Sequence, residues 1–388
     1  MRRAAIIVLD GLGIGPAHDQ ASYGDVGNDT LGNVCRVSGG LSLPNLAALG
    51  LGNCSALAGI GPVNRPAAAW GVAEPAGAGK DSTTGHWELC GVVLQQPFAV
   101  YPHGFPAGVI QAFSDRTGRG VLGNTTASGT AIIETLGARH LETGDWIVYT
   151  SADSVFQVAA HEDKVPLREL YAACEVARAL LVGPHAVARV IARPFVGTPG
   201  AFQRTGNRRD FSLPPPGETL LDKLAAHGVP RQGVGKVDDL FAGRNITSAH
   251  APTNAEAYHA IIAALNAMAG GLLLANVIEF DQSWGHRNDV AGFRQGLAEL
   301  DRVIPEVLAA VHPEDLVIFT ADHGNDPTTA STDHSRERVP VLAVGPQIAP
   351  VPLGVRRTFA DVGQTVAEYL GVPPLASGTS FLDVLLRA

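Results

Sequence analysis

The sequence contains acidic residues that could form a metal site, each placed near an apolar run that resembles a buried strand. Asp10 directly follows such a run near the N-terminus, and Asp281 and Asp322 come after similar runs at 272–280 and 316–320. In an open α/β sheet the carboxyl ends of parallel strands face one crevice, so we expect these carboxylates to converge. Without a cation, their repulsion and desolvation would cost several kcal/mol each.

Histidines supply further candidate ligands close to these acidic residues: His286, His323 and His334. A mixture of carboxylate oxygens and imidazole nitrogens suits first-row transition ions such as Mn²⁺ or Zn²⁺ better than Ca²⁺. Six ligands divide naturally between two ions, which lie about 3.5–4 Å apart in phosphoryl-transfer enzymes. One isolated Asp-His pair would more often be a helix cap and an ordinary polar histidine. The combination therefore favours a two-metal site.

A candidate nucleophile lies in the segment 79–88, Gly-Lys-Asp-Ser-Thr-Thr-Gly-His-Trp-Glu. An alcohol that loses its proton on binding a metal can attack phosphorus, and Ser82, Thr83 and Thr84 are the alcohols available. The alternative interpretation is that these hydroxyls cap a helix. The segment is not a P-loop, because Asp81 stands where that motif requires Ser or Thr after the lysine.

The composition describes a compact globular protein without a nucleic-acid partner. The chain has 388 residues, of which 46% are hydrophobic and 17% charged, and this length is enough for two domains. Its net charge of −9 argues against binding a phosphate backbone, which requires clustered Lys and Arg. An anionic substrate must therefore be neutralised locally, by a few arginines or by bound cations.

The cysteines and the N-terminus indicate the compartment. The four cysteines, Cys35, Cys54, Cys90 and Cys174, are widely separated and are expected to be buried free thiols. The N-terminal apolar run is too short for a signal peptide, and no stretch approaches the ~20 apolar residues that a membrane span needs. We expect a cytoplasmic protein with no membrane association and no obligate protein partner.

Hydrophobic periodicity predicts an α/β core. The apolar runs are typical of strands buried on both faces of a parallel sheet. Between the last two runs, apolar residues spaced three and four apart predict a helix over 290–304, which Pro305 should kink or end. This strand–helix–strand order predicts a mostly parallel sheet flanked by helices.

The middle of the chain predicts a separate, smaller domain. Prolines at positions 97–106 and 214–216 are plausible hinges, and strand and helix patterns lie between them, at 146–150 and 167–181 among others. We therefore predict a core formed by residues 1–96 and 217–388, with an inserted α+β cap domain at 97–216.

Several segments together resemble phosphopentomutases, which belong to the alkaline phosphatase superfamily. The segments are Asp10-Gly11, 79–88, 149–154, 191–197, Phe280-Asp281 to His286-Arg287, 321–327 and 332–334. The resemblance spans nearly the whole chain, and the set is far more specific than any single member.

This resemblance implies both a reaction and its cofactors. It implies an alkaline-phosphatase-like core with an inserted cap, and interconversion of ribose 1-phosphate with ribose 5-phosphate and of the corresponding deoxyribose phosphates. It also implies two Mn²⁺ per chain, with Zn²⁺, Co²⁺ or Mg²⁺ as substitutes, and a sugar bisphosphate as activator. The reaction would proceed through a phosphoenzyme and a 1,5-bisphosphate.

The resemblance also implies roles for particular residues. One ion would be held by Asp281, His286 and His334, and the other by Asp10, Asp322 and His323 together with the oxygen of Ser82. The family pattern has Thr where this chain has Ser82. A serine can perform the same attack, so Ser82 is the favoured nucleophile, with Thr83 and Thr84 as competitors.

Candidate substrate contacts lie mostly in the predicted cap. They are Ser151, Asp153 and Arg193, with Arg204, Arg208 and Lys236 as weaker candidates. Ordinary surface ion pairing is the alternative for each.

The nearest alternative functions are another phosphatase or a phosphoglycerate-type mutase on the same core. A non-catalytic metal or sugar-phosphate binding protein would have no need of an alcohol beside the metals.

Overall fold

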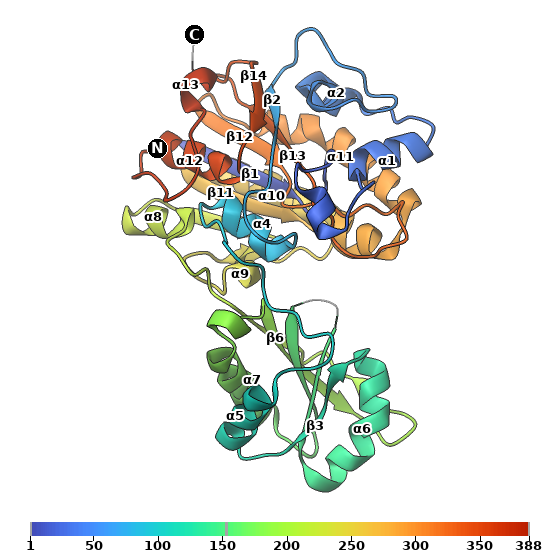
Figure 1. Ribbon diagram of the computed structural model, residues 1–388. Coiled ribbons are helices and arrows are strands. Elements are labelled where there is room, and N and C mark those ends of the chain that lie inside the picture. The colour runs from blue at the N-terminus through green and yellow to red at the C-terminus, as the bar shows by residue number, and fades with distance from the viewer. Residues whose placement is uncertain (1, 152–153, 387–388) are drawn as a thin grey trace. The chain divides into compact units, whose positions relative to one another are not determined.

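The computed structural model describes residues 2–151 and 154–386. Its contacts divide the chain into two compact units (Figure 1). Unit 1 combines Met1–Gln96 with Pro215–Ala388, and unit 2 is Pro97–Pro214. The sequence-based division placed the second boundary at residue 216. Each unit has its own sheet and its own helices.

Among the described residues, unit 1 is built on an eight-stranded mixed sheet with the strand order β10-β9-β11-β1-β12-β13-β2-β14. Its strands, in that order, are Ser248–Ala249, Arg231–Val234, Gly271–Val277, Arg3–Leu9, Asp315–Thr320, Val339–Val344, Ala69–Ala73 and Pro352–Arg356. Neighbouring strands are parallel except where β13 pairs antiparallel with β12 and β2. The mostly parallel α/β core is confirmed.

The central strands β1, β11 and β12 are buried along their whole length. This burial explains their continuous apolar sequences, because helices cover both faces of such a sheet. The run predicted at 272–280 is strand only as far as Val277. The chain then forms a π-helix, η3 (Phe280–Trp284), and a 3₁₀ turn, η4 (Gly285–Arg287). A continuous apolar run cannot locate this change of backbone conformation.

Helices pack on both faces of the unit 1 sheet (Figure 1). One group comprises α1 (Thr30–Val37), α2 (Pro44–Leu49), α10 (Asn254–Ala267) and α11 (Val290–Ala309), which contact one another. The other comprises α4 (Ser82–Leu89), α8 (Leu220–Ala226), α9 (Val237–Leu240) and α12 (Ala360–Tyr369). The short helices η1 (Gln20–Tyr23), α3 (Leu51–Cys54) and α13 (Leu382–Leu385) complete the unit.

Helix α11 does not end at Pro305 but continues to Ala309, which excludes one of the two outcomes predicted for this proline. A proline inside a helix leaves the carbonyl four residues earlier without its backbone donor. Here that carbonyl belongs to Asp301, and it accepts a hydrogen bond of 2.9 Å from the side-chain amide of Asn45. The Asn45 amide replaces the donor that proline lacks, which removes part of the cost of continuing the helix.

Unit 2 has a second sheet, with the strand order β3-β4-β5-β6-β7 and with β8 also paired to β6. Its strands are Val121–Thr126, Trp146–Thr150, Val155–His161, Arg189–Val196, Gln203–Arg204 and Arg209–Ser212. Helices α5 (Ala107–Thr117) and α7 (Leu167–Leu180) pack together and enclose a core around Phe156. Helix α6 (Gly129–Thr143) packs on a smaller core that includes Tyr149, and η2 (Gly183–His185) is a single turn.

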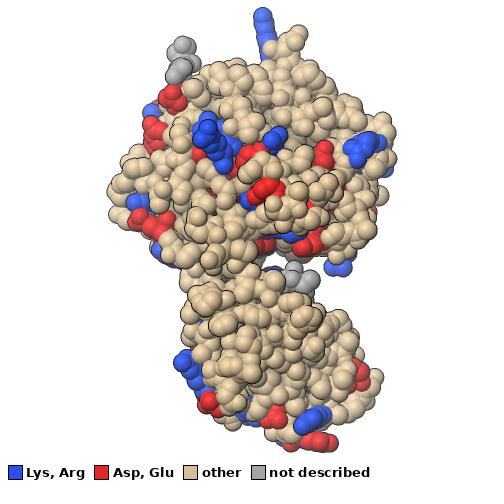
Figure 2. All heavy atoms as spheres, viewed as in Figure 1, with Lys and Arg blue, Asp and Glu red and all other residues tan. Residues whose placement is uncertain are grey.

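The sequence also led to expectations about the cysteines, about membrane spans and about clusters of charged side chains, and the structure bears on each of these features. All four cysteines are free, and three are buried while Cys54 is partly exposed. In the described part of the chain, no helix is both long and apolar enough to cross a membrane. On the face drawn in Figure 2, acidic and basic side chains are interspersed, and neither sign forms a continuous patch.

The core of unit 2 can be tested at Phe156, which is fully buried between Phe105 and Phe113. We expect Phe156→Ala to lower the stability of unit 2 by about 3–5 kcal/mol, because it leaves a cavity that the surrounding side chains cannot fill. The control Val182→Ala, at a side chain that is half exposed, should change stability by less than about 0.5 kcal/mol. Hydrogen–deuterium exchange of unit 2 peptides in increasing urea measures both, and equal effects would contradict this packing.

Candidate active site

The sheet register brings two of the predicted acidic residues to one edge. Val8 on β1 is paired with Thr320 on β12, so Asp10 and Asp322 both emerge at the carboxyl ends of neighbouring parallel strands. The Asp322 carboxylate accepts a hydrogen bond of 3.1 Å from the backbone N–H of Gly11. Both carboxylates are almost completely buried.

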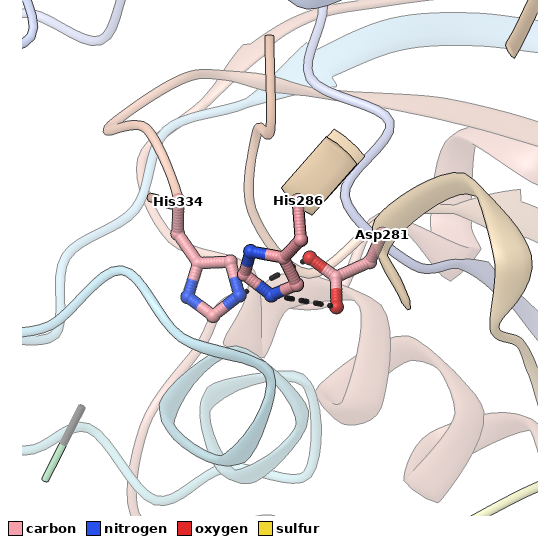
Figure 3. Close-up of side chains that lie close together, drawn as sticks. All are labelled: Asp281, His286 and His334. Carbon is pink, nitrogen blue, oxygen red and sulfur yellow. Dashed lines mark ion pairs between the residues drawn. The ribbon is translucent and has the colours of Figure 1, made fainter. Parts of the chain in front are cut away.

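A first set of ligand-type atoms is formed by Asp281, His286 and His334 (Figure 3). The Asp281 carboxylate lies 3.4 Å from His286 Nε2 through one oxygen and 3.1 Å from His334 Nε2 through the other. His286 Nδ1 lies 2.7 Å from the carbonyl oxygen of Thr332, which fixes the ring with Nε2 toward Asp281. Asp281 comes from the π-helix η3, and the histidines come from η4 and the loop before β13.

A second set is formed by Asp10, Asp281 and His323, whose ligand-type atoms all lie within 4.8 Å of one another. His323 Nε2 is 3.3 Å from Asp10 Oδ1. The carboxylate of Asp281 therefore belongs to both sets. The resemblance had grouped Asp322 with Asp10 and His323. In the structure Asp322 lies beside this set, with its Oδ2 atom 3.6 Å from His323 Nε2.

The donor atoms of the site fit divalent metal ions. Two of them, Asp322 Oδ2 and His334 Nε2, are buried and form no hydrogen bond among the described residues, although His86 Nδ1 lies 3.0 Å from the first and Asp281 Oδ1 lies 3.1 Å from the second. Buried polar atoms are normally satisfied, so unsatisfied atoms at a cluster of carboxylates and imidazoles indicate coordination. Oxygen and nitrogen donors together suit ions such as Mn²⁺ or Zn²⁺.

Ser82 is the first residue of helix α4, and its hydroxyl lies against the second set. The Oγ atom is 3.1 Å from Asp10 Oδ1 and 3.2 Å from His323 Nε2. The neighbouring hydroxyl of Thr84 is used differently, because it forms a capping box with the N-cap residue Asp81. The two interpretations of the Ser-Thr-Thr cluster thus apply to different residues, with capping at Thr84 and an alcohol beside the ligand cluster at Ser82.

Lys236, one of the weaker candidates for substrate contact, lies beside the ligand cluster in unit 1. Its ammonium group lies 2.8 Å from Asp10 Oδ2 and donates a hydrogen bond of 3.4 Å to Ser82 Oγ. Burial by itself would lower the pKa of Lys236, but the charges of Asp10 and Asp281 outweigh it and raise the pKa. The lysine is therefore a permanent cation beside the serine hydroxyl.

The pKa values within the cluster show how strongly it favours positive charge. Burial opposes ionisation of Asp10 and Asp281, yet neighbouring cationic groups hold both pKa values below the usual range. Burial likewise disfavours protonated imidazole, but the nearby carboxylates raise the pKa of His286 to about 9 and that of His323 to about 10. Carboxylates that stay ionised in a buried site attract cations of any kind.

Sequence reasoning assigned no role to three residues that hold these ligands in place. Asn276 donates a hydrogen bond of 3.1 Å to Asp10, and Asn325 donates one of 2.8 Å to Asp281. The third, His86, is fully buried, and its Nδ1 atom lies 3.0 Å from the Asp322 carboxylate while forming a hydrogen bond of 2.9 Å with the carbonyl oxygen of Ser82. A signal was present for Asn276, because a polar amide near the end of a strand buried on both faces requires a specific partner.

The substrate-contact candidates other than Lys236 lie in unit 2. Arg193 is on β6, Arg204 is on β7, and Arg208 precedes β8 and pairs with Asp210 at 2.7 Å. Ser151 directly follows β4. Asp153 lies outside the described residues.

Comparison with known proteins identifies the class. A family model described as the metalloenzyme superfamily matches residues 2–374. Among solved structures, a phosphoglycerate mutase from Leishmania mexicana aligns with a TM-score of 0.50 at 15% identity, covering 98% of this chain and 97% of that one. The chain is thus a metalloenzyme with the alkaline-phosphatase-like fold that the sequence predicted.

Curated relatives identify the family within this class. A phosphopentomutase from Dictyoglomus turgidum is 52% identical over 385 residues, covering 99% of this chain and 98% of the relative. A phosphopentomutase from Anaeromyxobacter dehalogenans is 54% identical over 388 residues, covering 100% of both. The chain belongs to the phosphopentomutase family, and it is an isomerase of the phosphate-transferring type.

Because Asp281 belongs to both sets of ligand-type atoms and His286 to only one, replacing these two residues should affect metal binding differently. We expect Asp281→Asn to reduce bound Mn²⁺ below about one ion per chain, whereas His286→Ala should retain about one, because His286 belongs to only one set. His259→Ala, at an exposed position on α10, should bind as the unmodified protein does. Metal analysis after exhaustive dialysis measures the ratios, and equal losses in both ligand variants would contradict a shared carboxylate.

Proposed function

We propose that this protein interconverts ribose 1-phosphate and ribose 5-phosphate, and the 2-deoxyribose pair, through a phosphorylated Ser82 and a 1,5-bisphosphate. The observation that carries the proposal is the position of Ser82 Oγ, within hydrogen-bond distance of Asp10, His323 and Lys236. An alcohol held among carboxylate, imidazole and ammonium groups at a two-set ligand cluster is suited to nucleophilic attack on phosphorus.

The metal ions would be divalent, and we propose Mn²⁺, with Zn²⁺, Co²⁺ or Mg²⁺ able to substitute. Asp281, His286 and His334 would hold one ion, and Asp10, Asp322 and His323 the other. The Asp281 carboxylate adjoins both sets of ligand-type atoms, and Ser82 Oγ adjoins the second set. When bound, the ions supply charge neutralisation and make the serine hydroxyl more acidic. The chain itself fixes where that hydroxyl lies.

The transfer takes place between two oxygens. A hydroxyl of the pentose monophosphate attacks the phosphorus on Ser82 and loses its proton, the bond from phosphorus to Oγ breaks, and Oγ takes up a proton as a sugar 1,5-bisphosphate forms. After the sugar reverses its orientation, Ser82 Oγ attacks the other phosphate and the isomeric monophosphate leaves. The ammonium group of Lys236 stabilises the negative charge that develops on Oγ in both steps. A sugar bisphosphate would phosphorylate Ser82 at the start and so act as the activator.

Unit 2 would act as a cap that recognises the sugar phosphate. Arg193, Arg204 and Arg208 are close enough that their charges lower the pKa of Tyr149 against the larger effect of burial, which raises it. The Tyr149 hydroxyl is buried without a partner among the described residues, and both it and Arg204 adjoin Gly129 at the start of helix α6. Repulsion between the arginines favours an anion there, and a phosphate group satisfies this requirement.

Ser151, which directly follows β4, and Asp153 remain proposed sugar contacts. The substrates would be small pentose phosphates, and no protein partner is proposed. Free cysteines throughout the chain fit a reducing compartment, so we propose the cytoplasm as its location.

The reaction is tested by ³¹P NMR of Mn²⁺-loaded protein with ribose 1-phosphate and a catalytic amount of ribose 1,5-bisphosphate. We expect ribose 5-phosphate to accumulate, because transfer to a sugar hydroxyl outcompetes transfer to water when the site excludes solvent. Omitting the bisphosphate should delay the onset. If inorganic phosphate were the main product, the protein would be a hydrolase on the same fold.

The nucleophile is tested by intact-mass measurement after incubation with the bisphosphate. We expect one added phosphoryl group in the unmodified protein and in Ser82→Thr, which keeps the hydroxyl, and none in Ser82→Ala. Activity of Ser82→Ala should fall by at least about 10³-fold, since the covalent route is lost. Continued phosphorylation of Ser82→Ala would assign the role to Thr83 or Thr84, and absence of phosphorylation in all three proteins would favour a binding protein.

A further inference from the structure

Arg336 is a buried arginine whose guanidinium group is completely engaged. It follows the ligand residue His334 by two positions, and only 3% of it is exposed. Nε and Nη2 donate to the two carboxylate oxygens of Asp19, each at 3.0 Å. Nη1 donates to the carbonyls of Gly77 and Gly79 at 2.7 and 2.6 Å, and Nη2 donates to that of Pro75 at 3.0 Å. All five N–H donors of the side chain therefore have an acceptor.

The carbonyls that Arg336 binds belong to the segment that leads into the nucleophile helix. Pro75, Gly77 and Gly79 are alternate residues of one stretch, which continues through Lys80 and Asp81 into α4. The stretch has little side chain of its own with which to pack, so its path depends on what binds its backbone. A planar guanidinium can bind three carbonyls and a carboxylate at once, whereas a lysine ammonium has three donors at a single point.

The other contacts of Arg336 anchor it to the framework. Its guanidinium lies 4.6 Å from the ring centre of Tyr23, and its backbone N–H donates to Asp25 at 2.8 Å. The same Asp25 carboxylate accepts from Lys80 at 2.9 Å. Lys80 also lies 3.4 Å from Asp333, the residue before the ligand His334. The segment before Ser82 and the loop that carries His334 are thus connected twice, through Arg336 and through Lys80.

We propose that Arg336 is a positioning residue that sets where Ser82 lies relative to the His334 loop. The proposal rests on the assignment of Ser82 as the phosphorylated residue. Attack on phosphorus requires the oxygen in line with the breaking bond, and a displacement of about 1 Å reduces such a rate by about 10²-fold. Losing the guanidinium frees three carbonyls in the segment that leads to Ser82 without removing any ligand-type side chain.

A purely structural role is the alternative, and Arg3 provides the matched control. Arg3 is equally buried, at 2% exposure. Its guanidinium pairs with Asp315 and donates to the carbonyls of Leu265, Met268 and Ala310. It lies at the start of β1, the opposite end of the strand from Asp10. Replacing Arg3 removes a similar set of hydrogen bonds without touching the segment before Ser82.

The experiment measures the rate at which ribose 1,5-bisphosphate phosphorylates Ser82. Rapid quench and intact mass are applied to the Mn²⁺-loaded unmodified protein, Arg336→Ala, Arg336→Lys and Arg3→Ala, with bound Mn²⁺ and thermal midpoint determined for each. We expect both Arg336 variants to be phosphorylated about 10²-fold more slowly with unchanged metal content. Arg3→Ala should lower the thermal midpoint but keep the unmodified rate. Guanidinium ion, at concentrations that do not unfold the protein, should accelerate Arg336→Ala and not Arg336→Lys.

Each outcome decides the question. A rate for Arg336→Ala equal to that of Arg3→Ala overturns the proposal, and so does a loss of bound Mn²⁺ that accounts for the slower rate. If Arg336→Ala does not fold, the rate and metal content of Arg336→Lys decide by the same criteria. If the unmodified protein is not phosphorylated on Ser82, the proposed function fails and Arg336 has no nucleophile to position. If every variant is instead phosphorylated at the unmodified rate, the positioning role of Arg336 is overturned while the proposed function stands.

Discussion

The structure of unit 1 depends on one electrostatic constraint, the burial of the carboxylates of Asp10, Asp281 and Asp322 at one edge of the sheet. Their exposed fractions are 0%, 3% and 2%. Carboxylates that lie this close together and are this well shielded from water stay ionised only when neighbouring groups compensate their charge, because desolvation alone would favour the neutral form. In this site the compensation keeps Asp10 and Asp281 ionised, as their lowered pKa values show.

The compensation comes from several elements at once, which explains why distant parts of the chain meet here. Lys236, before α9, supplies a full positive charge at 2.8 Å from Asp10. Neutral donors orient the carboxylates, with Asn276 from β11 on Asp10 and Asn325 on Asp281. Histidines from two loops supply donors that can bind protons or metal ions. Removing one contributor leaves the others with unbalanced charge, so the cluster acts as a unit rather than as a sum of pairs.

How far the sequence could predict this arrangement differs from one carboxylate to the next. Asp10 and Asp322 follow apolar runs that are typical of buried parallel strands, and the common edge of such strands then brings them together. Asp281 reaches the same place through a π-helix, for which its surroundings carry no periodic signal. Its position between both ligand sets therefore became visible only in three dimensions. The division of the two ligand sets inferred from the resemblance had placed Asp281 in one set alone.

The same limit applied to helix α11 and to unit 2. Pro305 is a valid local signal for the end of a helix, but the amide of Asn45, from a distant part of the chain, satisfies the carbonyl that the proline leaves free. In unit 2 the helix and strand patterns indicated an α+β domain, and the arginines were recognisable as candidates. The unsatisfied hydroxyl of Tyr149 beside them was not, since an aromatic residue in a strand usually contributes only to the core. Local patterns predict elements well, and they fail where a partner far along the chain changes the local balance.

Lys236 shows what this constraint means for catalysis. The ammonium group of this lysine, a candidate substrate contact, lies against both Asp10 and Ser82. Because the same cation stabilises a buried carboxylate and adjoins the Ser82 hydroxyl, the position of this hydroxyl is tied to the charge balance of the ligand cluster. A cation that only bound substrate could be replaced by a cation at another position around the substrate. Lys236 cannot be replaced in this way, since its loss would disturb the Asp10 carboxylate and the Ser82 hydroxyl together. The charge balance that lets the acidic residues be buried is therefore the same feature that fixes the position of the Ser82 hydroxyl.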